Sequence, residues 1–230
     1  MRVLDVGSGA GDVAFVVAEI VGSSGEVVGV DRAPAALAVA RSRAIGNSAS
    51  NVTFIEGDPA EMIFERPFDA VVGRYVLQFQ KDPAAMLRGL AARLHPGGLL
   101  AFHEIDWGGV GSFPRVSSFE RCCRWGTETL RQHGTETRMG AKLHATFTSA
   151  ELPAPTMRLE AQVGGVPTIA PWLNMFKELI ATLLPEMERL GVATAEEVGL
   201  ETLVERITKE AEALSSVIVG HYQVGAWINV

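Results

Sequence analysis

Short apolar runs alternate with helical segments through the first half of the chain. Three segments have helical spacing and predict helices over Asp12–Ile20, Ala35–Ala44 and Asp82 to about Leu94. The apolar runs predict strands at Arg2–Val6, Val27–Val30, Val52–Ile55, Phe68–Val72 and Leu99–Glu104. Continuous apolar strands separated by helices indicate a parallel sheet that is covered on both faces. The sequence therefore predicts an α/β fold with a doubly wound, mostly parallel sheet.

The second half of the chain is mostly helical. Its spacing predicts helices over Ser117–Gln132, Trp172–Leu190 and Ala195–Leu214, the last opening on a capping box from Thr194 to Glu197. A turn is predicted at His95–Gly98 and a strand with one exposed face at Met157–Val163. Val217–Val219 and Tyr222–Ile228 are predicted to form one last strand, with a bulge near Gly220 or Gly225. We predict a single domain over residues 1–230, with a core at 1–107, a helical region at 108–215 and a closing strand at 216–230.

Charge and composition narrow the possible partners. The net charge of −7 disfavours nucleic acid, because an acidic surface repels phosphates, and there is no Lys/Arg block. Apolar stretches such as Val13–Ala18 are too short to span a membrane, and no signal peptide precedes the first strand. We expect a cytoplasmic protein, monomer or homodimer, with Cys122 and Cys123 reduced. No cluster has the ligand spacing of zinc, so no metal is expected.

A glycine-rich loop joins the first strand to the first helix. Gly7, Gly9 and Gly11 permit positive φ and let a ligand approach the backbone, next to the free N–H groups of a helix N-terminus. Asp31 stands at the end of the second strand, where a carboxylate accepts hydrogen bonds from both ribose hydroxyls. This arrangement predicts a nucleoside-binding site.

The spacing of the loop discriminates between nucleoside ligands. A dinucleotide pattern G-x-G-x-x-G would need glycine at Asp12 or Ala14, although alanine is tolerated at the latter place. The Gly-Lys-Ser/Thr of a phosphate-binding loop is absent. Asp5 would repel a pyrophosphate and suits a ligand with a cationic amine. An NAD-linked oxidoreductase stays open as an alternative.

The segment VLDVGSGAGD resembles motif I of the class I S-adenosylmethionine-dependent methyltransferases. The resemblance continues in order through VVGVDRA, FIEGDPAEM, FDAVVGRYVLQFQKDP and LHPGGLLAFHEIDW, over about residues 1–107, and is greatest with the small-molecule, ubiquinone/menaquinone-biosynthesis-type branch. It implies a seven-stranded Rossmann-like sheet with a helical elaboration over the active site. It also implies S-adenosylmethionine as cofactor and S-adenosylhomocysteine as product. Family members usually carry helices before the first strand, and the resemblance implies either a truncated start or an unusually open site.

The resemblance implies that the glycine loop and the ends of the next strands bind the cofactor. The residues concerned are Asp5, Gly7, Ser8, Gly9, Gly11, Asp31, Arg32, Asp58, Pro59, Ala60, Gly73 and Arg74. Asp5 would lie near the amino group, Asp31 would bind the ribose, Arg32 or Ala33 would flank the adenine, and Asp58 would accept its amine. Gly73 and Arg74 would lie against the methionine end. Alternatively, the glycines serve only the turn, and Asp58 caps a helix.

Two residues at the end of the fifth predicted strand are candidate catalytic bases. Ligands of open α/β sheets bind beyond the carboxyl ends of the strands, which places His103 and Glu104 near an acceptor. Strand alternation puts their side chains on opposite faces, so both cannot enter one pocket unless the strand breaks. The alternatives are a half-buried structural histidine and a solvated glutamate. Further candidates are His144, His221, Tyr75 and Trp172.

We predict an enzyme that transfers a methyl group to a small, hydrophobic or aromatic acceptor by in-line displacement, with O- or C-methylation. The apolar content of the region 107–215, expected to form part of the acceptor pocket, is the reason for this substrate class. An alternative is a protein of the same fold that binds the cofactor without methylating, as a cyclase or a partner subunit.

Overall fold

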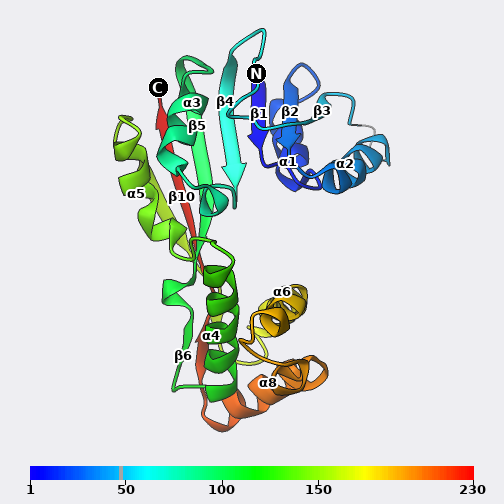
Figure 1. Cartoon of the computed structure of the whole chain (residues 1–230), viewed down its shortest axis with the longest axis vertical. Coiled ribbons are helices and arrows are strands. Elements are labelled where there is room, and N and C mark those ends of the chain that lie inside the picture. Colours follow the sequence, from blue (N-terminus) through cyan, green and yellow to red (C-terminus); the bar gives the residue numbers. More distant parts are fainter. Residues whose placement is uncertain (47–48) are drawn as a thin grey trace. The chain divides into compact units, whose positions relative to one another are not determined.

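A computed structural model describes residues 1–46 and 49–230 of the chain. A seven-stranded sheet has the order β3-β2-β1-β4-β5-β10-β7 (Figure 1). Its strands are β1 (Arg2–Val6), β2 (Glu26–Asp31), β3 (Val52–Glu56), β4 (Phe68–Arg74), β5 (Leu94–Asp106), β7 (Thr156–Glu160) and β10 (Tyr222–Asn229). Strands β1 to β5 pair in parallel. The predicted doubly wound, mostly parallel sheet of seven strands is confirmed.

Strand β10 is the exception to the parallel pairing. The amide of Val230 donates to the carbonyl of Gly98 at 3.0 Å, so β10 ends where β5 begins. Figure 1 shows the β10 arrow pointing opposite to the β4 arrow. The last strand therefore enters the sheet antiparallel and lies between β5 and β7.

Helices connect the parallel strands in the predicted order. They are α1 (Asp12–Val21), α2 (Pro34–Gly46) and α3 (Pro83–Ala91), with the short 3-10 helix η1 (Leu77–Phe79) after β4. α3 begins where predicted, because the Asp82 carboxylate accepts the Ala85 amide at 2.8 Å and proline stands at the first position. It ends before the predicted boundary, since the chain enters β5 at Leu94.

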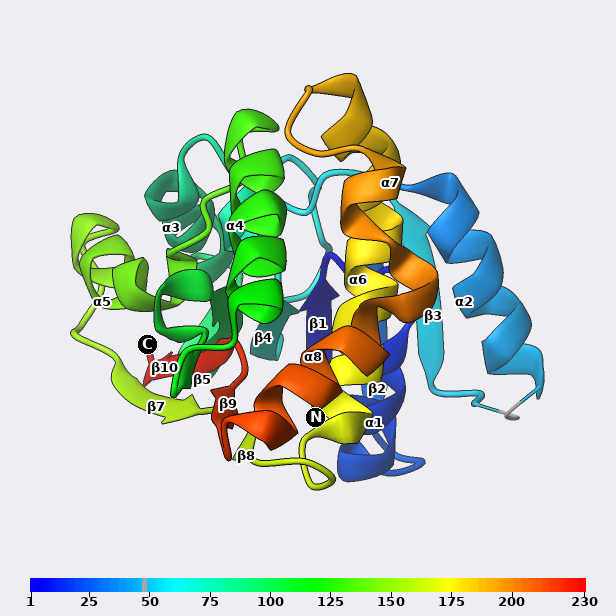
Figure 2. The ribbon, with the colours of Figure 1, turned by 90° about the horizontal axis from the view of Figure 1, so that it is seen from below.

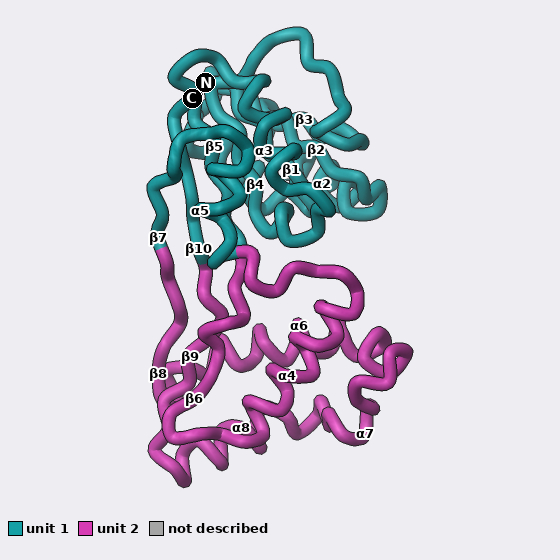
Figure 3. The backbone as a smooth tube through the Cα atoms, turned by 60° about the vertical axis from the view of Figure 1, so that its left-hand side comes forward, with its two compact units in different colours: residues 1–104, 140–158, 224–230 teal, residues 105–139, 159–223 magenta. Residues whose placement is uncertain are grey.

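The chain divides into two compact units, coloured separately in Figure 3. Unit 1 comprises residues 1–104, 140–158 and 224–230, and unit 2 comprises residues 105–139 and 159–223. Helix α5 (Met139–Ser149) was not predicted, and nearly all of it belongs to unit 1. The predicted helical region at 108–215 therefore contributes residues to both units.

Unit 2 contains packed helices and a small sheet. Helices α4 (Ser117–Gln132), α6 (Ala170–Arg189) and α8 (Leu203–Ala213) contact one another (Figure 2). Their buried face carries Phe119, Trp172 and Phe176, whose rings lie 5.4 to 6.0 Å apart. Strands β6 (Gly111–Phe113), β8 (Val163–Gly164) and β9 (Val217–Val219) form an antiparallel sheet in the order β6-β9-β8. Val217–Val219 and Tyr222–Asn229 thus belong to different sheets, not to one closing strand.

Two other predicted boundaries differ in the structure. The predicted helix Ala195–Leu214 is broken into α7 (Ala195–Val198), a 3-10 helix η3 (Leu200–Thr202) and α8, because Gly199 takes a φ of 56°. Its predicted capping box is confirmed: the Glu197 amide donates to the Thr194 hydroxyl, and the Thr194 amide donates to the Glu197 carboxylate. The predicted turn at His95–Gly98 lies within β5 as an irregularity, since Leu94 and Leu99 pair with Phe68 and Ala70.

Candidate functional site

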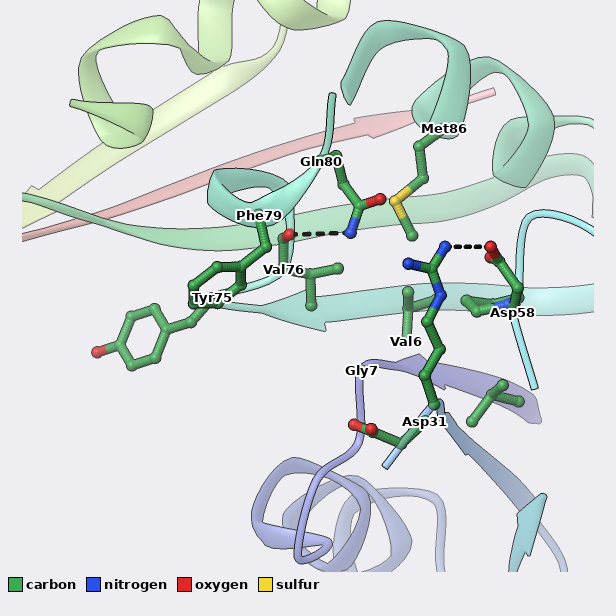
Figure 4. Close-up of a pocket in the computed structure, with 12 residues that line it drawn as sticks. Val6, Gly7, Asp31, Asp58, Tyr75, Val76, Phe79, Gln80 and Met86 are labelled. Carbon is green, nitrogen blue, oxygen red and sulfur yellow. Dashed lines mark hydrogen bonds and ion pairs between the residues drawn. The ribbon is translucent and has the colours of Figure 1, made fainter. Parts of the chain in front are cut away.

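A hollow of about 260 Å³ lies at the carboxyl ends of β1, β2 and β4 in unit 1. We call it the first hollow; its lining residues are Val6, Gly7, Val30, Asp31, Arg32, Asp58, Pro59, Tyr75, Val76, Phe79, Gln80 and Met86 (Figure 4). It brings together five predicted cofactor residues, namely Gly7, Asp31, Arg32, Asp58 and Pro59. In Figure 4 Asp58 and Tyr75 lie toward opposite ends of the group.

The glycine loop forms the part of the hollow nearest to α1. The amides of Gly7 and Ser8 both donate to the Val30 carbonyl, at 2.8 and 3.1 Å, which folds the loop against β2. At Gly7 the φ is +65°, and a Cβ would lie 2.7 Å from the Val76 side chain. At Gly9 the φ is +51°, but a Cβ would meet no atom within 4 Å. The backbone conformation favours glycine at both positions, and close packing against Val76 requires it at Gly7.

The Asp31 carboxylate is held in place by the backbone. Oδ2 accepts the Gly9 amide and Oδ1 accepts the Ala33 amide, both at 2.8 Å. Each carboxylate oxygen has a further lone pair, so the group retains capacity for two hydroxyl donors. Because the side chain is half-buried and lines the first hollow, the chemistry of this carboxylate fits a ribose.

Asp58 lies across the hollow and is already paired. Its carboxylate forms an ion pair with the Arg32 guanidinium (Figure 4), and Oδ1 accepts the Ala60 amide at 2.9 Å. The Arg32 side chain is 63% exposed, so the pair is reached by solvent. The predicted contact of Asp58 with an adenine amine stays a prediction. Ala60 is held beside Asp58 but does not line the hollow.

Asp5 and Ser8 lie outside the lining of the first hollow. Asp5 is 1% exposed, and burial raises the pKa of its carboxyl to about 7; the Ala14 amide opposes this shift, and the Asp31 charge adds to it. Its Oδ2 and the Ser8 hydroxyl have no hydrogen-bond partner among the described residues. Asp5 therefore lies beneath the loop at the start of α1. Its predicted contact with a cofactor amino group stays a prediction.

Glu104 contacts the segment that follows β4. It is fully buried, and Oε1 accepts the amides of Val76 and Leu77 at 2.9 and 2.8 Å. Burial raises the pKa of this carboxyl to about 7, although the backbone amides lower it. Glu104 does not line the first hollow; it holds the residues that do. His103 differs from its neighbour Glu104, as strand alternation predicts: its side chain is only half-buried.

A second hollow, of about 270 Å³, lies in unit 1 over β4, β5 and β10. Its lining residues are Val13, Val72, Gly73, Arg74, Ala101, Phe102, His103, Gly225, Ala226 and Trp227. The structure thus separates the predicted site residues: Gly73, Arg74 and His103 line the second hollow and not the first.

Most of one side of the first hollow is formed by residues that the sequence did not predict for the site. Val76, Phe79, Gln80 and Met86 line it, and Tyr75 was only a weaker candidate. Phe79 is 59% exposed, so part of its ring is open to solvent where it lines the hollow. The available signal was position alone, since Val76, Phe79 and Gln80 come soon after the carboxyl end of β4; Met86 lies farther on, in α3.

No group of three or more potential metal ligands is found among residues 1–46 and 49–230. No described helix is both long and apolar enough to cross a membrane. Both cysteines are buried, and desolvation raises the pKa of the Cys122 thiol to about 12.

Comparison with known proteins finds a family model that matches most of the chain. A family model described as "Methyltransferase domain" matches residues 1–167. A 2-phytyl-1,4-naphtoquinone methyltransferase of Synechococcus elongatus is 41% identical over 106 residues, covering 45% of this chain and 46% of that protein. The aklanonic acid methyltransferase DauC of Streptomyces sp. (strain C5) is 39% identical over 114 residues, covering 49% and 51%. The chain thus spans about half the length of these curated relatives.

Solved structures agree with the fold. A protein of Bacillus halodurans C-125 superposes with a TM-score of 0.64 at 17% identity, covering 99% of this chain and 91% of that one. The phosphoethanolamine N-methyltransferase 2 of Haemonchus contortus, in complex with S-adenosyl-L-methionine, has a TM-score of 0.55 at 21% identity, covering 98% and 48%. At these identities the likeness shows the fold alone.

Proposed function

Because the chain belongs to the methyltransferase domain family, we propose that it transfers a methyl group from S-adenosylmethionine to a small organic acceptor. The observation that carries the proposal is the Asp31 carboxylate, fixed by two backbone amides at the end of β2 and facing the hollow beside the glycine loop. When bound, S-adenosylmethionine supplies a methyl group on a positively charged sulfur, which makes that carbon electrophilic.

We assign the first hollow to the cofactor. Asp31 binds the ribose hydroxyls, and the glycine loop lets the ligand approach the backbone closely. Pro59, Phe79 and Met86 supply apolar surface for the adenine, with the Arg32–Asp58 pair at its edge. Glu104 acts here as a positioning residue rather than a base, because its described contacts are with backbone amides.

The acceptor class follows from the relatives and from the cysteines. The named relatives act on a naphthoquinone and on aklanonic acid, and we propose a small apolar or aromatic acceptor with O- or C-methylation. Other relatives are arsenite methyltransferases. Arsenic(III) prefers thiolate ligands, whereas Cys122 and Cys123 are buried with raised pKa values. This difference favours an organic acceptor, with His103 as the group that removes its proton. A cytoplasmic location and a monomeric or dimeric state stay predictions.

Calorimetric titration with S-adenosylhomocysteine tests the proposal. The wild-type chain should bind, and Asp31→Asn should weaken binding at least about tenfold, because it removes the charge that both ribose hydroxyls meet. Glu19→Gln, which makes the same change of charge on an exposed face of α1, should bind as the wild type does. No binding by the wild type, or equal binding by Asp31→Asn, would overturn the proposal. Cofactor binding with acceptor turnover but without formation of S-adenosylhomocysteine would favour the non-methylating alternative.

A further inference from the structure

A histidine lies inside the aromatic core of unit 2. His221 stands between β9 and β10 and is 4% exposed. The centre of its ring lies 4.0 Å from that of Trp107, 5.3 Å from that of Trp172 and 5.9 Å from that of Phe176. These rings come from the 3-10 helix η2 (Trp107–Gly109) and from α6. Three segments of unit 2 that are distant in the chain therefore meet at this histidine.

The backbone lies directly on the rings of this aromatic cluster. A Cβ placed on Gly220 would lie 2.6 Å from the Trp172 ring, and a Cβ on Gly126 of α4 would lie 3.2 Å from the Trp107 ring. Glycine at these two positions lets the chain approach the rings closely. Water therefore reaches the buried histidine only when one of these segments moves.

The histidine ring has no partner that would stabilise a charge. Among residues 1–46 and 49–230, its Nε2 has no hydrogen-bond partner. A second proton would make both ring nitrogens donors and give the ring a positive charge. Aromatic faces attract a cation, but burying a charge whose donors have no acceptor costs more than this attraction returns. The packing around His221 therefore favours the neutral ring, and burial lowers its pKa from 6.5 to about 4.

The charged groups of the neighbouring elements do not supply a counter-charge. Asp106, which precedes η2, is paired with Arg138 at 2.9 Å. On α6, Lys177 is half-buried and Glu178 is exposed, and neither contributes to the pKa of the histidine, which burial alone shifts. The adjacent Tyr222 is a phenol and is neutral in acid.

The other histidine of unit 2 responds to acid in the opposite direction. His133 is exposed, and its Nδ1 lies 3.3 Å from Oε1 of Glu186. This carboxylate stays charged at pH 5, because its hydrogen bond with Arg189 lowers its pKa to about 2. A second proton on His133 therefore strengthens an ion pair. Of the two histidines, only His221 makes unit 2 less stable when it is protonated.

We infer that His221 makes unit 2 acid-sensitive: when its ring takes a second proton from solvent, the aromatic cluster opens, while the sheet of unit 1 stays folded. The stability that the neutral ring supplies is fully present above pH 6.5 and is lost as the pH falls through 4. Unit 1 responds in the opposite sense, because its buried Asp5 and Glu104 have raised pKa values and hold their protons more tightly when folded. The inference does not depend on the proposed function, since His221 lines neither hollow.

Amide hydrogen exchange of the full chain at pH 7.5 and pH 5, corrected for the intrinsic exchange rate, measures the opening of each unit. The lowered pKa of His221 raises the opening constant of unit 2 by about thirtyfold between these pH values. Protection of the α4 and α6 amides should fall by that factor, whereas protection of the β1 and β4 amides should not fall. His221→Phe keeps an aromatic ring without a titrating group and should remove the fall. His133→Gln, the matched control in the same unit, should keep it.

Thermal melts at pH 7.5 accompany both variants. If His221→Phe does not fold, His221→Leu takes its place. The inference is overturned if the wild-type α4 and α6 amides keep or gain protection at pH 5, because the ring faces would then stabilise the cation. It is also overturned if both units lose protection together, if the fall persists in a folded His221 variant, or if His133→Gln abolishes it.

Discussion

Two pairs of carboxyl groups surround the first hollow, and the fold treats them in opposite ways. Asp31 and Asp58 line the hollow and are half-buried. Asp31 accepts backbone amides with both carboxylate oxygens, and Asp58 accepts one backbone amide with one oxygen. Asp5 and Glu104 lie beneath its lining, are at most 1% exposed, and each keeps one oxygen without a described partner. We call them the lining pair and the supporting pair. Residue type alone does not distinguish a ligand-binding carboxylate from one that shapes the site; burial and partners do.

The largest expected effect concerns the supporting pair. Glu104→Ala should lower the free energy of unfolding by about 3 kcal/mol, because it leaves the buried amides of Val76 and Leu77 without an acceptor. Chemical denaturation measures this loss. Glu104→Gln, which keeps an acceptor oxygen, is the matched variant and should lose less. Equal stability of Glu104→Ala and the wild type would remove Glu104 from the supporting pair.

Next in size is the pH dependence of stability. The pKa values of Asp5 and Glu104 are raised on folding from 3.8 and 4.5 to about 7, so the folded chain holds their protons more tightly than the unfolded chain. The contribution of these two protonated groups to the free energy of unfolding is fully present below pH 4 and is lost as the pH rises through 7. The free energy of unfolding should therefore fall by roughly 3 kcal/mol per group over that interval.

Denaturant titrations between pH 5 and 8 check this slope. Asp5→Asn and Glu104→Gln should each flatten it strongly, whereas Asp31→Asn, from the lining pair, should flatten it only slightly, by removing the charge that adds to the Asp5 shift. If the pH dependence of stability were lost in Asp31→Asn and kept in Asp5→Asn and Glu104→Gln, the roles of the two pairs would be reversed.

The smallest effect on stability is expected in the lining pair. Arg32→Met breaks the ion pair with Asp58, and because the arginine is 63% exposed the unfolding free energy should change by less than about 0.5 kcal/mol. Affinity for S-adenosylhomocysteine should change more than stability does, since both residues line the first hollow. Parallel denaturation and calorimetry on this variant give the two numbers. A large loss of stability with unchanged affinity would move Asp58 into the supporting pair.

The sheet of unit 1 was predictable because buried parallel strands leave continuous apolar runs that end in glycine or acidic residues. The same reasoning gave Asp31 its place at the end of β2, and alternation put His103 and Glu104 on different faces of β5. These features depend on local pattern, which a sequence displays directly.

Other parts of the site depend on contacts distant in the chain. The hydrogen bonds of Glu104 with Val76 and Leu77 join β5 to the segment that follows β4, so no local pattern marks Glu104 as a support. The side of the hollow formed by Tyr75 to Gln80 depends on one left-handed residue, which tyrosine rarely is. In unit 2, Gly199 lies inside the predicted helix Ala195–Leu214, and an isolated glycine is often tolerated within a helix. The sequence did not show that Gly199 takes a positive φ and ends α7.

The left-handed Tyr75 also has a thermodynamic consequence. Its side chain lines the first hollow and contacts Arg74 and His103, which line the second, so a movement of this ring would alter the surface of both. Any ligand that moves this ring from one side changes the affinity on the other side by some factor. Linkage then requires the second ligand to return that same factor to the first. One left-handed residue thus connects the geometry of the two hollows, without a hinge or a moving domain.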